Sequence, residues 1–351
     1  MVPPAIATPD FAAIVLRWQA HHGRHDLPWQ HPRDPYRVWL SEVMLQQTRV
    51  QTVLAYFPRF LERFPDITTL ACAPEEDVLA AWAGMGYYGR ARNLHRCAQQ
   101  VMACHGGAFP RSAAQLRTLP GIGASTAHAI AALCFGERVA IFDANVRRVL
   151  ARFLGFGADL SVRMHEHTLW AEATRLLPQS NDPTDLARYT QGMMDLGATV
   201  CTARSPRCAD CPLRAECVAY RLGTPQRFPH PPRRIARELL TMWLLWVQAD
   251  DDALWLLRRP SRGIWAGLYC LPTCPTHAAV LAALPPHATS HTIPPIQHEL
   301  THRTLLLHPV YCRFPCRIPL PLEGQWMSAT DWPTLGFPAP IRRLLLEQPP
   351  A

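Results

Sequence analysis

Apolar residues recur every three or four positions through most of the first 220 residues. One such series is Phe11, Ile14, Val15 and Trp18. This spacing puts the apolar side chains on one face of an α-helix. The pattern therefore predicts a succession of helices over 11–220, separated by loops rich in proline, histidine and aspartate.

The pattern changes after residue 220. Positions 221–237 are dominated by proline and arginine and have no hydrophobic period, which predicts an extended basic linker. Beyond it, apolar runs over 239–260 flank an aspartate-rich turn, as in a β-hairpin. We expect further strands at 265–272 and 305–314, and short helices at 277–286 and 340–348. The C-terminal part is therefore predicted to be a small mixed α/β domain.

Length, charge and cysteine content indicate the number of domains, the kind of partner and the cellular compartment to expect. A chain of 351 residues exceeds one typical core, so we expect two domains. The net charge of +8 favours a polyanionic partner. The first ten residues have no features of a secretory signal, and no apolar run is long enough to span a bilayer. We expect a cytoplasmic protein, nucleoid-associated if bacterial, whose 12 cysteines are metal ligands or reduced core thiols.

The segment 119–148 carries the first candidate chemistry. Pro120, Gly121 and Gly123 form a tight turn before an alanine-rich helix. The glycines allow close approach of an anion, and the first N–H groups of the helix can hold a phosphate. About twenty residues later, Asp143 precedes a second helix. The alternative is an ordinary turn between helices, followed by an aspartate that only caps the second one.

A second carboxylic acid lies in the predicted helix 36–50, which Asp34 can cap and Pro35 can begin. Glu42 is surrounded there by apolar residues, and desolvation favours its protonated form. Asp143 is expected to stay ionised, because a helix N-terminus favours negative charge. A neutral acid and a carboxylate are the pair that cleaves glycosidic bonds. The alternative for Glu42 is a solvated helix residue.

Aromatic, basic and cysteine residues add further candidates. The segment 84–93 combines glycines, tyrosines and arginines, which suits base stacking or a plain turn between helices. Four cysteines in a C-x6-C-x2-C-x5-C pattern predict a metal site, and zinc and a 4Fe–4S cluster both accept four thiolates. These are Cys201, Cys208, Cys211 and Cys217. A second site formed by Cys270, Cys274, Cys312 and Cys316 is less favoured, because strand positions would not converge.

Together these motifs resemble the helix-hairpin-helix DNA glycosylases, and within them the MutY family of adenine DNA glycosylases. The resemblance covers nearly the whole chain and rests on LPWQ, PYRVWLSEVMLQQT, GMGYYGRARNLH, LPGIGAST, FDANVRRVLAR, QGMMDLGATVC and the four-cysteine loop. It implies an all-helical catalytic region, one 4Fe–4S cluster, and removal of adenine mispaired with 8-oxoguanine or guanine. It also implies a C-terminal MutT-like domain that senses the oxidised base.

The resemblance assigns roles by position. Glu42 is similar to the acid that protonates adenine, Asp143 to the carboxylate that stabilises the oxocarbenium ion, and Asn145 to a supporting residue. Gln47 and Tyr87 resemble residues wedged into the duplex beside the mispair.

Three more positions complete the comparison within the helical region. Gln191 and Gln30 lie where the family lines the adenine pocket. Ser125 stands where endonuclease III-like enzymes have a lysine that attacks the sugar. A hydroxyl forms no imine, so we expect a monofunctional glycosylase that leaves an abasic site.

The C-terminal domain departs from two family patterns. The stretch after Gly267 has no glutamate, so the metal-dependent hydrolysis of nucleotides is not expected. The Phe-Ser-His lesion-recognition loop of the family is Leu300, Thr301 and His302 here, which retains a hydroxyl and an imidazole without the aromatic ring.

We therefore predict a catalytic region at 1–220, with a six-helix lobe at about 30–137 and a cluster lobe from 1–29 and 138–220. The linker at 221–237 and the lesion-recognition domain at 238–351 follow. The expected partner is mispaired double-stranded DNA, bound by a monomer, with the linker available to a repair or replication protein. The alternatives are an endonuclease III-like bifunctional enzyme for damaged pyrimidines and a non-catalytic, redox-sensing DNA-binding module.

Overall fold

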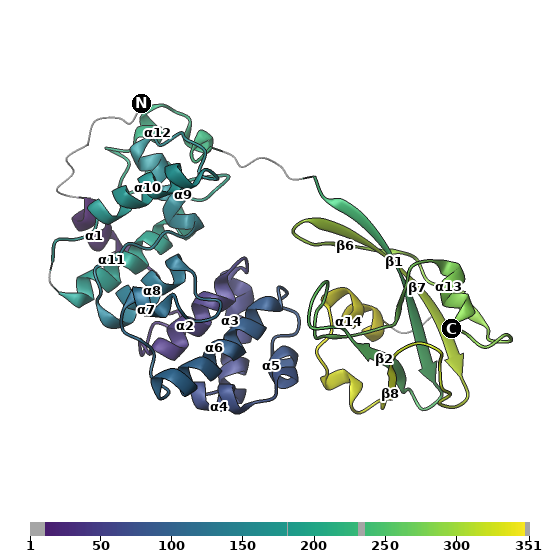
Figure 1. Ribbon diagram of the computed structural model, residues 1–351. Coiled ribbons are helices and arrows are strands. Elements are labelled where there is room, and N and C mark those ends of the chain that lie inside the picture. Colours follow the sequence, from purple (N-terminus) through teal and green to yellow (C-terminus); the bar gives the residue numbers. More distant parts are fainter. Residues whose placement is uncertain (1–10, 181, 231–235, 348–351) are drawn as a thin grey trace. The chain divides into compact units, whose positions relative to one another are not determined.

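The computed structural model describes residues 11–180, 182–230 and 236–347. Their contacts form two compact units: the described residues up to 71 with 96–230, and 72–95 with those from 236. Helices build the first unit and a mixed sheet dominates the second, which confirms the predicted fold class (Figure 1). The boundaries of the lobes, the linker and the C-terminal domain stay a prediction. These predicted segments contain residues 1–10, 181, 231–235 and 348–351, which lie outside the described residues.

Helices follow one another through the first unit, as the apolar period predicts. None of the helices in the described ranges is long and apolar enough to cross a membrane. The helices are α1 (Phe11–His22), α2 (Pro35–Leu45), α3 (Val50–Arg63), α4 (Ile67–Cys72), α6 (Gly89–His105), α7 (Ala113–Leu116), α8 (Ala124–Phe135), α9 (Ala144–Leu154), α10 (Arg163–Arg175), α11 (Pro183–Asp195) and α12 (Val218–Arg221). Both α4 and α6 cross into the second unit, at their last residue and at their first turns respectively.

The starts of α2 and α9 are specified locally. Asp34 accepts a hydrogen bond from Arg37 N at 3.0 Å, and Pro35 occupies the first turn. Asp143 accepts one from Val146 N at 2.7 Å. Each aspartate satisfies an N–H group that the helix leaves without a partner, so both predicted caps are confirmed.

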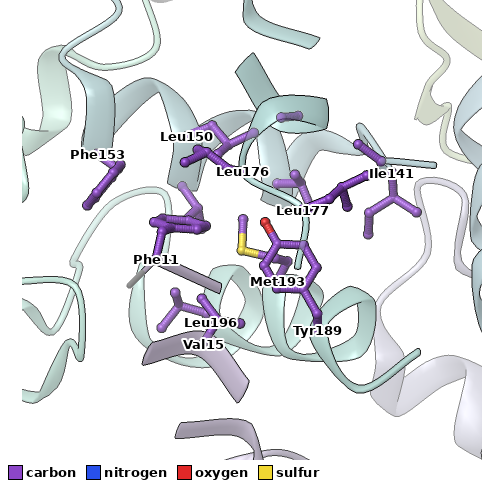
Figure 2. Close-up of a cluster of buried hydrophobic side chains, with 14 of the residues drawn as sticks. Phe11, Val15, Ile141, Leu150, Phe153, Leu176, Leu177, Tyr189, Met193 and Leu196 are labelled. Atoms are coloured by element: carbon purple, nitrogen blue, oxygen red, sulfur yellow. The ribbon is translucent and has the colours of Figure 1, made fainter. Parts of the chain in front are cut away.

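The core beside α9 joins segments that are far apart in the sequence. Figure 2 shows Phe11 of α1 packed against Phe153 of α9, with ring centroids 4.7 Å apart. Tyr189 and Met193 of α11 belong to the same buried cluster. This packing fixes the axis of α9 and therefore the position of Asp143 at its start.

The second unit is built on an eight-stranded mixed sheet with the order β3-β2-β1-β7-β5, to which β4, β6 and β8 add at the sides. The long strands β1 and β7 run parallel from Glu238 opposite Arg303 to Ala249 opposite Phe314. The strands are β1 (Glu238–Ala249), β2 (Leu254–Arg258), β3 (Tyr269–Cys270), β4 (Thr273–Cys274), β5 (Ser290–Thr292), β6 (Ile296–Glu299), β7 (Arg303–Phe314) and β8 (Gln325–Met327).

Both faces of this sheet are covered. Leu244 of β1 packs in a cluster with Ile341 of α14 (Ala339–Leu346). The next residue, Leu245, packs in another cluster with Val280 of α13 (His277–Ala282). Because successive side chains of a strand point to opposite faces, β1 is buried on both sides, which explains its long apolar run.

The helix α5 (Glu75–Ala81) and the first turns of α6 also belong to the second unit. The hydroxyl of Tyr88 donates to Phe337 O at 2.7 Å, and Arg92 Nη1 donates to Ala266 O at 2.5 Å. These bonds join the glycine-rich segment before α6 to the sheet domain.

Most C-terminal elements match the sequence pattern. The hairpin β1–β2, the strand β7 and the helices α13 and α14 are confirmed. The segment 265–272 was expected to be a strand, but only β3 lies in it, and Leu271 and Pro272 separate β3 from β4. The strands β5, β6 and β8 were not predicted, because three or four residues are too few to show a period.

We predict that Gly197→Ala destabilises the protein. An added Cβ would lie 2.7 Å from Asn145 Cβ and 3.0 Å from Asn145 O, in the rigid first turn of α9. Helix propensity alone would favour alanine, so a loss of about 1–3 kcal/mol in the free energy of unfolding reports the overlap. Urea unfolding measures it. Gly157→Ala is the control, since its Cβ would meet Phe228 at an ordinary 3.5 Å. Equal stability of the two variants would contradict the prediction.

Candidate active site

The turn before α8 is open, as anion binding requires. Gly121 has a φ of 75°, a left-handed conformation that glycine adopts without strain. Gly123 caps α8 without a side-chain hydrogen bond, and a Cβ added there would meet no described atom within 4 Å. Main-chain N–H groups at this turn are therefore accessible to a phosphate.

Glu42 borders a narrow cavity whose wall is mainly apolar and includes Trp29, Met194 and the polar Gln191. The residue as a whole is half-buried, while its carboxyl group is enclosed. Burial, and to a smaller extent the nearby charge of Asp143, raise the pKa of Glu42 to about 8. At neutral pH the side chain is therefore a neutral acid, as its apolar neighbours in the sequence indicate.

Asp143 departs from its expected setting. Burial raises its pKa, whereas we expected the N-terminus of α9 to favour the ionised form without opposition. The hydrogen bonds of Val146 and Asn145 and the charge of Arg148 do lower the pKa of Asp143, but desolvation is the larger effect. The sequence shows the cap and not the tertiary packing that buries it.

The two carboxyl groups are close enough for the charge of one to raise the pKa of the other. The titrations of two such acids are coupled, so one of them keeps its proton while the other is ionised. Asp143 accepts hydrogen bonds from Val146 N at 2.7 Å and Asn145 Nδ2 at 3.4 Å, whereas no hydrogen bond within the described chain reaches the carboxyl of Glu42. The shared proton therefore resides on Glu42 and the negative charge on Asp143.

Asn145 connects this pair to a neighbouring arginine. Its Oδ1 accepts from Arg148 Nη2 at 2.8 Å while its Nδ2 faces Asp143. Arg148 also donates to Gly197 O at 2.7 Å and to Cys201 O at 2.7 Å. The guanidinium group of Arg148 therefore orients the Asn145 amide toward Asp143.

Ser125 lies in the first turn of α8, and its Oγ accepts from Phe142 N at 3.3 Å. Phe142 directly precedes Asp143, so this hydroxyl helps to place the carboxylate. Ser125 is an acceptor in this contact and brings no amine to the site.

Sequence patterns missed an ion pair beside Gln191. Asp195 is fully buried and bonds to Arg24 Nη2 at 2.7 Å, while Gln191 Nε2 donates to Asp195 Oδ1 at 2.8 Å. Arg24 and Gln191 both line the cavity that contains Glu42. Gln30, the other predicted pocket residue, lines a neighbouring cavity. The partners Arg24 and Asp195 are 171 positions apart, so no local motif reveals them.

The two predicted wedge residues lie in different units. Gln47 follows α2 in the first unit and has a φ of 57°. Tyr87 belongs to the second unit, has a φ of 51° and leaves 49% of its side chain exposed. A positive φ is rare outside glycine and is stored strain, which often marks functional positions. Each side chain is therefore presented from a sharply turned backbone.

The four cysteines of the C-x6-C-x2-C-x5-C loop surround one cavity. Burial raises the pKa values of Cys208, Cys211 and Cys217, and the other thiols of the loop add to these rises, so the sulfurs are mutually close. Arg152, only 3% exposed, donates to Thr202 O at 2.6 Å and to Ala203 O at 2.9 Å. The loop is thus folded around a buried guanidinium that no sequence pattern identified.

The four cysteines line one cavity, and a multi-iron cluster takes one thiolate at each iron. Arg152 Nη1 lies 3.4 Å from Cys201 Sγ and supplies positive charge to the thiolates. The cavity among the cysteines therefore suits an iron–sulfur cluster.

In the C-terminal domain, Thr301 and His302 are exposed at the turn between β6 and β7, and Leu300 packs against the core of the domain. The aromatic ring of the family's loop has thus been replaced by a residue with a packing role. Cys270 and Cys274 belong to different core clusters, and neither is grouped with other ligands in the described chain.

Comparisons with known proteins agree with this geometry. Residues 40–174 match the HhH-GPD superfamily base excision DNA repair protein model, 201–217 the iron–sulfur binding domain of endonuclease III, and 242–347 the NUDIX domain. Adenine DNA glycosylase from Buchnera aphidicola (strain APS) is 32% identical over 95% of this chain and 96% of its own. The Homo sapiens adenine DNA glycosylase is 41% identical over 60% of this chain and 39% of its own.

Two solved structures share the fold of the helical part. A thermostable thymine-DNA glycosylase matches with a TM-score of 0.53 and 28% identity, over 60% of this chain and 95% of its own. A trapped endonuclease III–DNA covalent intermediate matches with a TM-score of 0.50 and 22% identity, over 61% and 94%.

We predict that Glu42→Gln stabilises the protein near neutral pH. The unfolded Glu42 loses its proton near pH 4.5 and the folded one near pH 8, so between these values the unfolded state binds fewer protons. The free energy of unfolding of the native protein therefore falls as pH rises through this window. Glutamine does not titrate, so the variant lacks this loss. We expect the free energy of unfolding of Glu42→Gln, relative to that of the native protein, to be about 1–3 kcal/mol higher at pH 7 than at pH 4.

Urea unfolding at pH 4, 5.5 and 7 measures the effect. Glu62→Gln on the exposed face of α3 is the control and should leave the pH dependence unchanged. If the difference in the free energy of unfolding between Glu42→Gln and the native protein is the same at all three pH values, the burial of Glu42 is contradicted.

Proposed function

Because this chain belongs to the adenine DNA glycosylase family, we propose that Glu42 and Asp143 divide the cleavage of the N-glycosidic bond of adenine between them. The protein is a DNA glycosylase of base excision repair that removes adenine from DNA. The observation that carries the division of roles is the raised pKa of Glu42, to about 8, beside a hydrogen-bonded Asp143.

Each acid has one task in this reaction. Adenine leaves poorly as an anion, and protonation of a ring nitrogen by Glu42 lets it leave as a neutral base. The C1′–N bond breaks, positive charge develops on the sugar, and Asp143 stabilises that charge or bonds to it transiently. A water then adds to C1′ and gives up its proton to the Glu42 carboxylate, which restores the acid. Asn145 and Arg148 hold the Asp143 carboxylate for this purpose.

The base enters from an extrahelical position, because the bond is not accessible within the duplex stack. Gln47 and Tyr87 each act as a wedge in the duplex beside the mispair, and Gln191 contacts the flipped adenine next to Glu42. Gln30 supports this pocket from the neighbouring cavity. The main chain at Gly121 and Gly123 holds a backbone phosphate.

The enzyme is monofunctional. Strand cleavage through a Schiff base needs an amine at the sugar, and Ser125 offers a hydroxyl that accepts from Phe142 N. The product is an intact strand with an abasic site. This distinguishes the chain from a bifunctional glycosylase of the endonuclease III kind.

The preferred substrate is adenine opposite 8-oxoguanine, with adenine opposite guanine second. The exposed Thr301 and His302 at the β6–β7 turn offer a hydroxyl and an imidazole to the oxidised base. The stretch after Gly267 lacks the glutamates of a nucleotide hydrolase, so this domain acts in recognition.

The protein carries an iron–sulfur cluster on the loop 201–217. We assign it as one 4Fe–4S cluster, because Cys201, Cys208, Cys211 and Cys217 supply four thiolates around one cavity. Bound there, the cluster holds the loop folded. Arg204, Arg207 and Arg214 then lie on a fixed loop that contacts the DNA backbone. The protein acts as a monomer, and the basic linker is available to a repair or replication partner.

We predict that Glu42→Gln binds the lesion duplex and releases no adenine. The amide has no transferable proton, so the single-turnover rate should fall by about 10²–10⁴-fold while the affinity for DNA changes little. Duplexes with adenine opposite 8-oxoguanine, guanine or thymine are incubated with excess native or variant protein. Release of adenine and strand breakage with and without alkali are measured.

The three readouts separate the hypotheses. Breakage only after alkali supports a monofunctional enzyme, whereas breakage without alkali would contradict the Ser125 argument. Normal turnover by Glu42→Gln would remove Glu42 from the mechanism. Absence of product from native protein in excess would leave a non-catalytic DNA-binding module. Glu62→Gln serves as the matched control for loss of a carboxylate.

A further inference from the structure

A second cavity lies beside the one that contains Glu42. It has a volume of about 430 Å³ and is bordered by the end of α1, by the loop before α2 and by the first turns of α11. The two cavities share Arg24, while Glu42 lines only the first. A volume in this range suits a small organic ligand.

The wall of this cavity is strongly basic. Three arginines and two histidines line it, and its described lining contains no carboxylate. These residues are Arg24, Arg33, Arg188, His25 and His31. Several cationic side chains around one space, without acidic residues in the wall, favour an anionic occupant.

Not all of this charge is neutralised within the protein. Arg24 Nη2 forms a close ion pair with Asp195 Oδ1 at 2.7 Å. The ion pair of Arg188 with Asp185 is looser, with 3.8 Å between Nη1 and Oδ1. No ion pair of Arg33 occurs within the described chain, and burial together with the charge of Arg188 lowers the pKa of Arg33. Arg33 and Arg188 thus repel each other across a partly desolvated space. An anion between them would relieve that repulsion, and a phosphate matches the planar donor array of arginine.

The cavity also contains an unsatisfied acceptor. Gln30 is 5% exposed, and its Oε1 has no hydrogen-bond partner among the residues that the structure describes. A buried acceptor without a donor costs about 1–3 kcal/mol. A bare phosphate would not remove this cost, whereas a ligand that also carries an amine or hydroxyl donor would.

We propose that this cavity is a second ligand site and that it binds a nucleotide, with the phosphate between Arg33 and Arg188 and a base or sugar donor on Gln30. The nucleotide is either a free nucleoside monophosphate or one residue of a DNA strand, since both present the same groups. The site is distinct from the excision pocket. It contacts that pocket through Arg24, whose partner Asp195 also binds Gln191.

The test uses the full-length protein with its cluster. AMP, adenosine and inorganic phosphate are titrated into native protein and into Arg33→Gln/Arg188→Gln, with binding measured by calorimetry. The control is Arg163→Gln/Arg262→Gln, which removes equal charge from two exposed arginines elsewhere. We expect AMP to bind native and control protein alike, at least 10-fold more tightly than adenosine or phosphate. The cavity variant should lose at least 10-fold in AMP affinity.

A second arm identifies the source of the nucleotide. Affinity for an abasic-site duplex is measured over a range of salt concentrations for the same three proteins. If AMP does not bind, a specific loss of duplex affinity and a shallower salt slope in the cavity variant assign the site to a DNA nucleotide. If AMP and duplex bind equally to the cavity variant and the control, the proposal is wrong. The comparison of AMP with adenosine on native protein decides the phosphate requirement even if the variant folds poorly.

Neither arm depends on excision of adenine. Failure of the catalytic assignment would leave the binding results intact, and the reverse also holds.

Discussion

One proton shared by two buried acids is the constraint on which the catalytic end of this molecule depends. Two negative charges in a poorly solvated space repel strongly, so Glu42 and Asp143 do not both ionise at neutral pH. The distribution of hydrogen-bond donors decides which one keeps the proton. Donors converge on Asp143, and an apolar wall surrounds Glu42. By where it places N–H groups, the fold thus helps to determine which carboxyl group stays neutral and which carries the charge.

This placement extends well beyond the two side chains. The position of Asp143 is fixed by the start of α9, which it caps. The packing of Phe153 against Phe11 in turn fixes the axis of α9. From the same helix, Arg148 reaches Cys201 O at 2.7 Å and Arg152 fills the interior of the cysteine loop. A change in that loop would therefore be transmitted to Asp143 through one rigid helix. The cysteine loop and the Asp143 carboxyl group are therefore held by the same helix.

Whether a feature of the fold or the site could be predicted from the sequence depends on how far apart its interacting residues lie along the chain. The caps Asp34 and Asp143 and the long strands β1 and β7 follow from neighbouring residues, and the structure has them where the sequence indicates. The pairing of Arg24 with Asp195 spans 171 positions, and the rise in the pKa of Asp143 comes from tertiary burial. Neither leaves a local pattern. Similarly, Gln30 has the expected residue type, yet only the packed structure shows that it faces a different cavity from Glu42.

Ser125 contributes to the structure of this site as well as to its chemistry. Its Oγ accepts from Phe142 N, so it supports the backbone immediately before Asp143 as well as lacking an amine. A lysine ammonium has only donors and would leave that N–H group without its partner. A lysine nucleophile also needs a lowered pKa, and a neutral amine beside Asp143 would lose the stabilisation that a carboxylate gives to its charged form. A carboxylate at Asp143 would therefore favour the charged form of an amine at position 125 and would oppose its action as a nucleophile.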